Sequence, residues 1–150
     1  LAPVLTPDGV PILVVTALSS YVIAVKSDSQ RFYWIDPGEV TIDPLNFASA
    51  EAEPDNIVDA IAVGDHVWLL GQSATEAWYA TGDLAAPFAP AQGRAYARGV
   101  WPGTTVKVKD SVLLVGQDGI VYDVGAGVKP ISNNAIAERI RAQIRFERGL

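Results

Sequence analysis

The chain has 150 residues and a formal net charge of −6, a length sufficient for one domain with a sizeable buried core. It contains no cysteine, which excludes a disulfide framework and a thiolate metal site. No run of 18 apolar residues occurs, so we expect no membrane-spanning helix. Because residue 1 is Leu and no Met occurs anywhere, we expect the chain to be a fragment or a processed piece.

Charge is distributed unevenly along the chain. Residues 1–105 carry four Lys and Arg against twelve Asp and Glu, a net of −8, whereas residues 106–150 carry seven against five, a net of +2. An acidic surface repels phosphate backbones, and the long acidic part has no basic stripe that would release counterions. We therefore predict no direct sequence-specific nucleic-acid binding.

Three apolar segments recur at a fixed offset of 45 residues: YVIAVKS (21–27), HVWLLGQ (66–72) and SVLLVGQ (111–117). Each is bounded by polar or glycine residues, which is typical of a buried strand, and no helical pattern separates the copies. A strand-rich repeat of this length predicts propeller blades rather than helical repeats.

Each unit is predicted to be an antiparallel meander of three strands, with room for a fourth. The first strands are expected at residues 12–17, 57–63 and 104–109, and the three recurring segments follow as second strands. The third strands are aromatic, in RFYWI (31–35), EAWYA (76–80) and GIVYDV (119–124). Asp118-Gly119 is the strongest hairpin signal, because glycine readily takes positive φ. The candidate fourth strands are 39–42 and 93–98.

The predicted fold is therefore all-β, a partial β-propeller of about three antiparallel blade-like units with a C-terminal α-helix. The units occupy residues 1–131, at about 5–42, 43–90 and 91–131, and the helix occupies residues 132–150. Closed propellers use four to eight blades, so three units are too few. Either further chain or copies of the same chain are expected to complete the assembly, since an open edge leaves backbone groups unpaired.

The C-terminal segment has the pattern of an amphipathic helix. Ile136, Ile140 and Ile144 recur every four residues, and a Ser or Asn at 132–134 is available as N-cap. We expect this stripe to pack either on the third unit or on another chain, with Arg141 and Arg145 on the outward side. The candidate partner contacts are Ile136, Ile140, Arg141, Ile144 and Arg145.

The sequence contains no recognisable arrangement of catalytic residues. Its one histidine, His66, lies next to Asp65 in a turn, and no serine has the surroundings of a nucleophile elbow. An acidic cluster lacks the spacing of a calcium loop and is interpreted as a solvated loop: Glu51, Glu53, Asp55 and Asp59. We predict that the chain is not an enzyme, and we identify no catalytic, cofactor-binding or metal-binding residue.

The aromatic side chains of the strands are expected in the core or between blades, with a sugar-binding platform as the alternative. Trp101 differs from them, because it precedes a proline in a predicted loop.

A resemblance to a known family is carried by residues 43–140. Its strongest part ends in TEAWYATGD (75–83), and LLVGQDGIVYDVGAG (113–127) and PISNNAIAERI (130–140) extend it. These segments resemble the packaged-DNA stabilisation proteins of short-tailed bacteriophages, also called tail hub or nozzle proteins. The resemblance implies a β-propeller that attaches below the portal ring and closes the channel, so that packaged DNA does not leak.

The resemblance further implies a virion structural protein of a phage or prophage, assembled in the host cytoplasm. Its partners would be other tail or portal proteins and copies of itself, with no cofactor and no catalytic residue. The alternative is a ligand-binding or glycan-processing propeller. Sialidase-like blades carry a Ser-x-Asp-x-Gly-x-Thr-Trp box, and SDSQRFYW (27–34) fails it at the glycine and in spacing. The sequence therefore favours the structural role.

Overall fold

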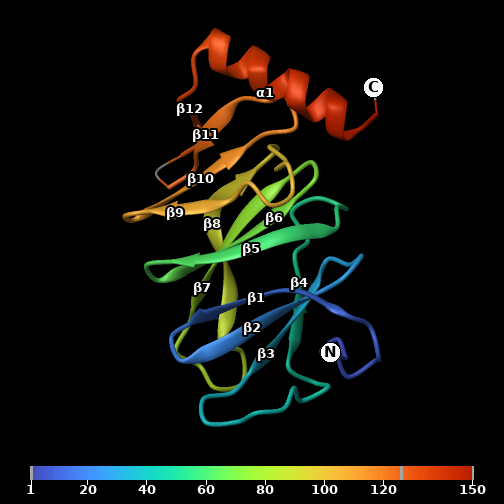
Figure 1. The fold of residues 1–150 in the computed structure, drawn as a ribbon. Helices are drawn as coiled ribbons and strands as arrows, with labels where there is room; N and C mark the ends of the chain where they lie inside the picture. Colours follow the sequence, from blue (N-terminus) through green and yellow to red (C-terminus); the bar gives the residue numbers. More distant parts are fainter. Residues whose placement is uncertain (1, 126, 150) are drawn as a thin grey trace.

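A computed structural model describes residues 2–125 and 127–149 and shows three four-stranded antiparallel sheets followed by one helix (Figure 1). The first sheet comprises β1 (Ile12–Leu18), β2 (Tyr21–Lys26), β3 (Arg31–Ile35) and β4 (Phe47–Ser49). The second comprises β5 (Ile57–Val63), β6 (His66–Gly71), β7 (Thr75–Ala80) and β8 (Phe88–Tyr96). The third comprises β9 (Val106–Val108), β10 (Ser111–Val115), β11 (Val121–Asp123) and β12 (Lys129–Pro130). Helix α1 (Asn134–Glu147) follows.

Each sheet is a meander in which consecutive strands pair, and the predicted all-β fold with a C-terminal helix is confirmed. The three recurring segments form β2, β6 and β10, the second strand of each sheet. Leu1, Ala126 and Leu150 of the predicted units and helix lie outside the described residues. In the part of the chain that the structure describes, no helix is long and apolar enough to cross a membrane.

The predicted fourth strand at residues 39–42 is wrong, because the segment after β3 turns instead of extending. The backbone N–H of Glu39 donates to the carbonyl of Asp36 at 3.0 Å, and Gly38 has a φ of +88°. The fourth strand is β4, which pairs with β3. In the second sheet the fourth strand is β8, which begins at Phe88, before the predicted segment 93–98.

The core consists of two apolar clusters, one on each side of the second sheet. Alternate side chains of β6 enter different clusters: Val67 and Leu69 pack with the first sheet, and Trp68 and Leu70 pack with the third. All four are at most 2% exposed. This two-sided burial explains why β6 is a continuous apolar run rather than an alternating one.

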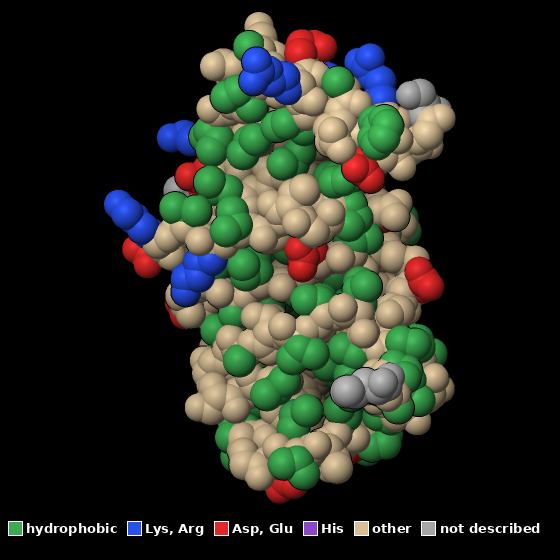
Figure 2. Space-filling model, in the orientation of Figure 1, with side chains coloured by type: hydrophobic (Ala, Val, Ile, Leu, Met, Phe, Trp, Pro, Cys, Tyr) green, Lys and Arg blue, Asp and Glu red, His purple; other side chains and the backbone are tan. Residues whose placement is uncertain are grey.

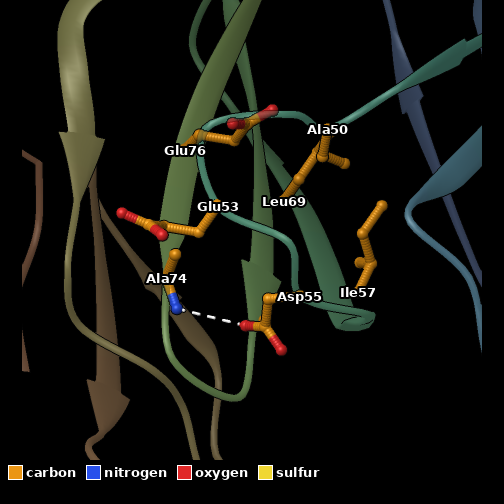
Figure 3. A pocket seen from close by; sticks show the side chains of 8 residues that line it. Ala50, Glu53, Asp55, Ile57, Leu69, Ala74 and Glu76 are labelled. Carbon is orange, nitrogen blue, oxygen red and sulfur yellow. Dashed lines mark hydrogen bonds between the residues drawn. The ribbon is translucent and has the colours of Figure 1, made fainter.

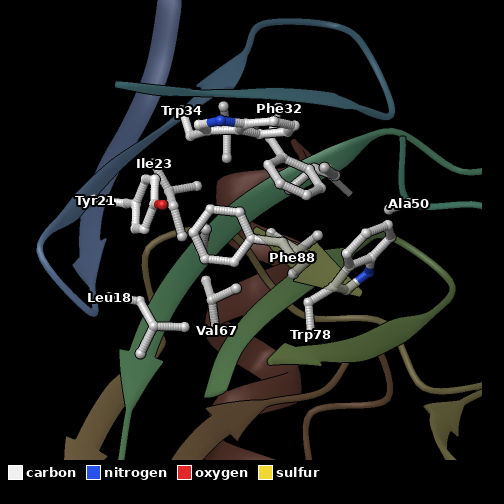
Figure 4. Packing of buried hydrophobic residues seen from close by; sticks show 13 residues of the cluster. Leu18, Tyr21, Ile23, Phe32, Trp34, Ala50, Val67, Trp78 and Phe88 are labelled. Carbon is white, nitrogen blue, oxygen red and sulfur yellow. The ribbon is translucent and has the colours of Figure 1, made fainter. Parts of the chain in front are cut away.

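Aromatic rings fill the space between the first and second sheets (Figure 4). The ring centroids of Phe32 and Trp78 lie 5.1 Å apart and nearly perpendicular, and those of Trp34 and Phe88 lie 5.7 Å apart. Edge-to-face pairs at these distances add to the free energy of burial. The expectation that the strand aromatics lie in the core or between blades is confirmed for Trp34 and Trp78 and is wrong for Tyr79, which is 40% exposed.

The burial of β6 on both sides leads to a prediction about stability. Replacing Leu69 or Leu70 with Ala should each lower the free energy of unfolding by about 2 to 5 kcal/mol, because each leaves a cavity in one cluster. Leu45→Ala is the matched control, since Leu45 is 82% exposed, and it should cost less than about 0.5 kcal/mol. Urea unfolding of the three variants measures this, and equal losses at all three positions would contradict the two-sided core.

Candidate assembly surface

Helix α1 buries a different face from the one that the isoleucine spacing predicts. Its N-cap is Asn133, whose side-chain oxygen accepts from the backbone N–H of Ile136 at 2.9 Å. Ala137 and Ile144 are the buried residues of α1, Ile140 is half-buried, and Ile136 is 47% exposed. The expected stripe is therefore wrong at Ile136, because a spacing of four residues drifts around a helix that has 3.6 residues per turn.

Arg141 lies on the inner side of α1, which corrects the prediction that it faces outward. Its Nε donates to the backbone carbonyl of Asp118 at 2.8 Å, and its guanidinium also donates to Glu138 at 2.6 Å. Asp118 and Gly119 form the turn between β10 and β11, so this arginine ties the middle of α1 to the third sheet.

Gly119 lets the helix approach this turn closely. Its φ is +79°, and a Cβ built on it would lie 2.6 Å from Cγ of Arg141 and 3.4 Å from the carbonyl oxygen of Ala137. Glycine is needed here both for the backbone conformation and for the space.

The C-terminal end of α1 is attached through Arg148, its C-cap. The guanidinium lies 4.5 Å from the ring centroid of Trp101 and donates to the side-chain oxygen of Gln117. The side-chain nitrogen of Gln117 donates in turn to the carbonyl of Val100 at 2.6 Å. The end of the helix thus contacts both the third sheet and the segment that connects it to the second sheet.

The carboxylate of Asp118 organises the turn on which α1 rests. It accepts from the Tyr122 hydroxyl at 2.5 Å, from Arg98 at 2.9 Å and from the backbone N–H of Ile120 at 3.0 Å. Arg98 also lies 4.5 Å over the Tyr122 ring. Burial raises the pKa of Tyr122, and its hydrogen bond to Asp118 and the carboxylate's negative charge raise it further.

Apolar and basic side chains are also exposed at several positions along α1. Ile136 is 47% exposed and Phe146 is 77% exposed. Arg145 is exposed in the last turn, where positive charge is favoured by the helix dipole. Of the five predicted contact residues, the structure therefore buries Ile144, bonds Arg141 to Asp118, half-buries Ile140 and leaves Ile136 and Arg145 accessible.

The acidic segment after β4 makes contacts that the sequence did not predict. Asp55 accepts from the backbone N–H groups of Ser73 and Ala74 at 2.7 and 3.2 Å, and so holds the turn between β6 and β7. Figure 3 shows Asp55, Glu53 and Glu76 around a cavity of about 20 Å³. Within residues 2–125 and 127–149, no group of His, Asp and Glu side chains has an arrangement that could hold a metal ion.

Buried Glu76 and half-buried His66 both have local partners. The carboxylate of Glu76 accepts from the backbone N–H of Ala52 at 2.9 Å and from the indole of Trp78 at 2.5 Å. His66 lies 2.5 Å from Asp65, and this contact lowers the pKa of the Asp65 carboxyl. The described contacts of Glu76 connect the first two sheets.

Comparison with known proteins gives one family and a set of similar folds. The family model described as bacteriophage P22 Gp10, β-propeller, matches residues 2–144. BamB from Moraxella catarrhalis is 14% identical with a TM-score of 0.55, over 79% of this chain and 36% of that one. YCF48 bound to D1 peptide is 14% identical with a TM-score of 0.55, over 86% of this chain and 42% of that one. The search of curated proteins found no match.

These comparisons confirm the predicted propeller-like fold. At 14% identity the two solved structures show similarity of fold alone. The chain spans about two fifths or less of the length of each.

Substitution of Gly119 tests the docking of α1. Gly119→Ala and Gly103→Ala should each lower the free energy of unfolding by about 1 kcal/mol through backbone strain. The reason is that each glycine has positive φ, +79° and +77°. Only Gly119→Ala also forces a methyl group against Arg141, since nothing lies within 4 Å of a Cβ at Gly103. Hydrogen exchange of the α1 amides should therefore accelerate in Gly119→Ala alone, and equal exchange in both variants would contradict this docking.

The raised pKa of Tyr122 predicts how stability changes in alkali. The neutral hydroxyl is the stabilised form, so its contribution is complete below the ordinary pKa of 10.0 and is lost as pH rises through the higher folded-state pKa. Tyr122→Phe should lower the free energy of unfolding by roughly 1 to 3 kcal/mol at neutral pH. Above pH 10.0 the stability of this variant should decline less steeply with pH than that of the wild type. Urea midpoints measured across this pH range test it.

Tyr79→Phe is the control for that experiment, because the Tyr79 side chain is 40% exposed and its loss should change the midpoint little. Parallel alkaline declines in wild type and Tyr122→Phe would show that the Tyr122 hydroxyl is not the responsible group.

Proposed function

We propose that this chain, which belongs to the bacteriophage P22 Gp10 β-propeller family, is part of the tail hub or nozzle of a short-tailed phage or prophage. There it helps to close the portal channel and to stabilise the packaged DNA. The observation that supports this most strongly is the family match over residues 2–144, which includes all three sheets and most of α1. The site of action is then the virion, after assembly in the host cytoplasm.

A non-catalytic role agrees with how the polar side chains are used. Asp55, Glu76 and Asp118 each accept hydrogen bonds from backbone or neighbouring side chains that fix a turn or a connection between sheets. General acid or base catalysis needs a group placed to reach a substrate proton. The hydrogen bonds described for these carboxylates instead hold turns and connections between sheets in place.

The exposed side chains of α1 are the proposed contact with other tail or portal proteins. Ile136 and Arg145 are its accessible members, and Phe146 extends it. Ile140, Arg141 and Ile144 act indirectly, because they lie at or near the contact with the third sheet and hold α1 in place. An exposed apolar and basic surface suits a partner surface with apolar and acidic groups.

Phage particles made without the chain test this function. Deletion of its gene should leave capsids that package DNA but lose it, which is measured as nuclease-sensitive DNA and a fall in infectious titre. Complementation with the wild-type chain should restore both. Complementation with Ile136→Asp combined with Arg145→Glu should restore them poorly, because the contact surface reverses its charge.

Val40→Asp is the matched control, since Val40 is 90% exposed on the loop between β3 and β4. It should complement as well as the wild type. Particles that retain their DNA and infectivity without the chain would show that the proposed role is wrong.

A further inference from the structure

Two cavities adjoin at the hairpin turns of the three sheets. One, of about 330 Å³, lies at the junction of the second and third sheets and is lined by Gln72, Trp101, Pro102, Gln117 and Arg148. The other, of about 320 Å³, lies at the junction of the first and second sheets, and its lining includes Ser27, Asp28, Asn56, Gln72 and Pro102. Gln72 and Pro102 belong to both cavities, so the two form one groove, which we name the turn groove.

The 45-residue repeat builds the turn groove. Ser27, Gln72 and Gln117 occupy the same position of the repeat, just after the second strand of each sheet, and all three line the groove. In Figure 1 the turns that follow β2, β6 and β10 lie on the side of the molecule on which α1 ends. Because packed sheets lie roughly 10 Å apart, this row of polar side chains is spaced for an elongated ligand. Figure 2 shows how charged and apolar side chains share the surface over these sheets.

Trp101 provides a fixed aromatic surface in the turn groove. Its backbone N–H donates to the carbonyl of Val115 at 2.7 Å, and its carbonyl accepts from the Thr104 hydroxyl at 2.6 Å. The ring is half-buried, and the guanidinium of Arg148 lies 4.5 Å from its centroid. A ligand in the groove therefore meets an apolar surface next to a planar set of hydrogen-bond donors, and neither has to be ordered on binding.

The polar side chains of the turn groove can both donate and accept hydrogen bonds. Gln72, Asn56 and Asp28 are exposed, so their amide and carboxylate groups are accessible to a ligand. Gln117 is half-buried, and its side-chain nitrogen donates to the carbonyl of Val100. A side-chain amide has two donor hydrogens and one acceptor oxygen, which suits neighbouring hydroxyl groups that also donate and accept. Hydroxyl groups around the edge of an apolar ring are the surface that a sugar presents.

Other classes of ligand fit the turn groove less well. An extended peptide adds to the free edge of a strand, whereas this groove crosses the turns at which strands end. Nucleic acid needs a basic stripe, and residues 1–105 have a net charge of −8. Glycoside hydrolysis needs a pair of carboxyl groups, and among the described residues that line the groove Asp28 carries the only one.

We propose that the turn groove binds an oligosaccharide without cleaving it. One sugar ring lies against Trp101, with its hydroxyls bonded to Gln72 and Arg148, and a further sugar reaches Asn56 and Asp28. This site goes beyond the proposed function, because it is argued from the side chains of the groove and not from the phage role. The failure of either proposal therefore leaves the other standing.

An array of defined neutral and acidic oligosaccharides, probed with the full chain, tests the proposal. Each oligosaccharide that binds is then titrated by calorimetry and by tryptophan fluorescence. Trp34, Trp68 and Trp78 are at most 7% exposed, so the half-buried Trp101 should produce the change in emission on binding. Trp101→Leu should remove this change and weaken binding roughly tenfold.

Gln72→Ala removes the amide that both cavities share. It should weaken binding roughly tenfold, because it deletes hydrogen bonds to the ligand. It should leave the near-ultraviolet circular dichroism unchanged, because Gln72 is exposed. Gln92→Ala is the matched control, since Gln92 is exposed on β8 and is not among the residues that line the groove. It should bind as tightly as the wild type.

Three outcomes would overturn the proposal. The wild type can fail to bind any oligosaccharide of the array at millimolar concentration. Binding can be equally tight in Gln72→Ala, Trp101→Leu and the wild type, which would place the site on another surface. A parallel array of peptides can bind where no oligosaccharide does, which would show that the turn groove takes a protein segment instead.

Discussion

The structure depends on burial of β6, the second strand of the middle sheet, from both sides. In β6, Val67 and Leu69 need the first sheet while Trp68 and Leu70 need the third, so the second sheet cannot bury its apolar residues alone. Stability in such an array comes mainly from contacts between neighbouring units. The middle sheet is accordingly the one whose strands are buried most completely, with four of the six residues of β6 at most 2% exposed.

Carboxylates also join neighbouring sheets, through hydrogen bonds to the segments that connect them. Glu76 in β7 holds Ala52, which lies in the connection from the first sheet, and Asp118 in the third sheet holds Arg98, which lies in the connection from the second. A buried carboxylate such as Glu76 is tolerated only when its oxygens accept hydrogen bonds, and those of the half-buried Asp118 are bonded as well. Both groups therefore help to fix the relative placement of the sheets.

The strands that are deeply buried were predicted correctly from the sequence. The prediction failed for elements that are only partly buried. The central strands follow from apolar runs repeated at 45 residues, because a strand covered on both faces leaves that pattern. The short edge strand β4 leaves no such pattern, since Phe47 is 38% exposed, and turn chemistry at Gly38 displaced it from the predicted segment. The helix was found, but its inner face was misplaced: Arg141 contacts Asp118 through its Nε, and no spacing rule reveals that an arginine bonds a backbone carbonyl across 23 residues.

The contact between α1 and the third sheet differs in kind from the contacts between sheets. Between sheets, rings such as Phe32 and Trp78 interlock over a broad apolar area. In α1, two buried side chains are supplemented by two arginines, Arg141 on Asp118 at the middle of the helix and Arg148 on Trp101 at its C-terminal end. Polar contacts of half-exposed arginines are weakened by solvent and salt, whereas apolar burial is not. The helix is therefore the most easily released element of the stack, and salt should loosen it before it loosens any sheet.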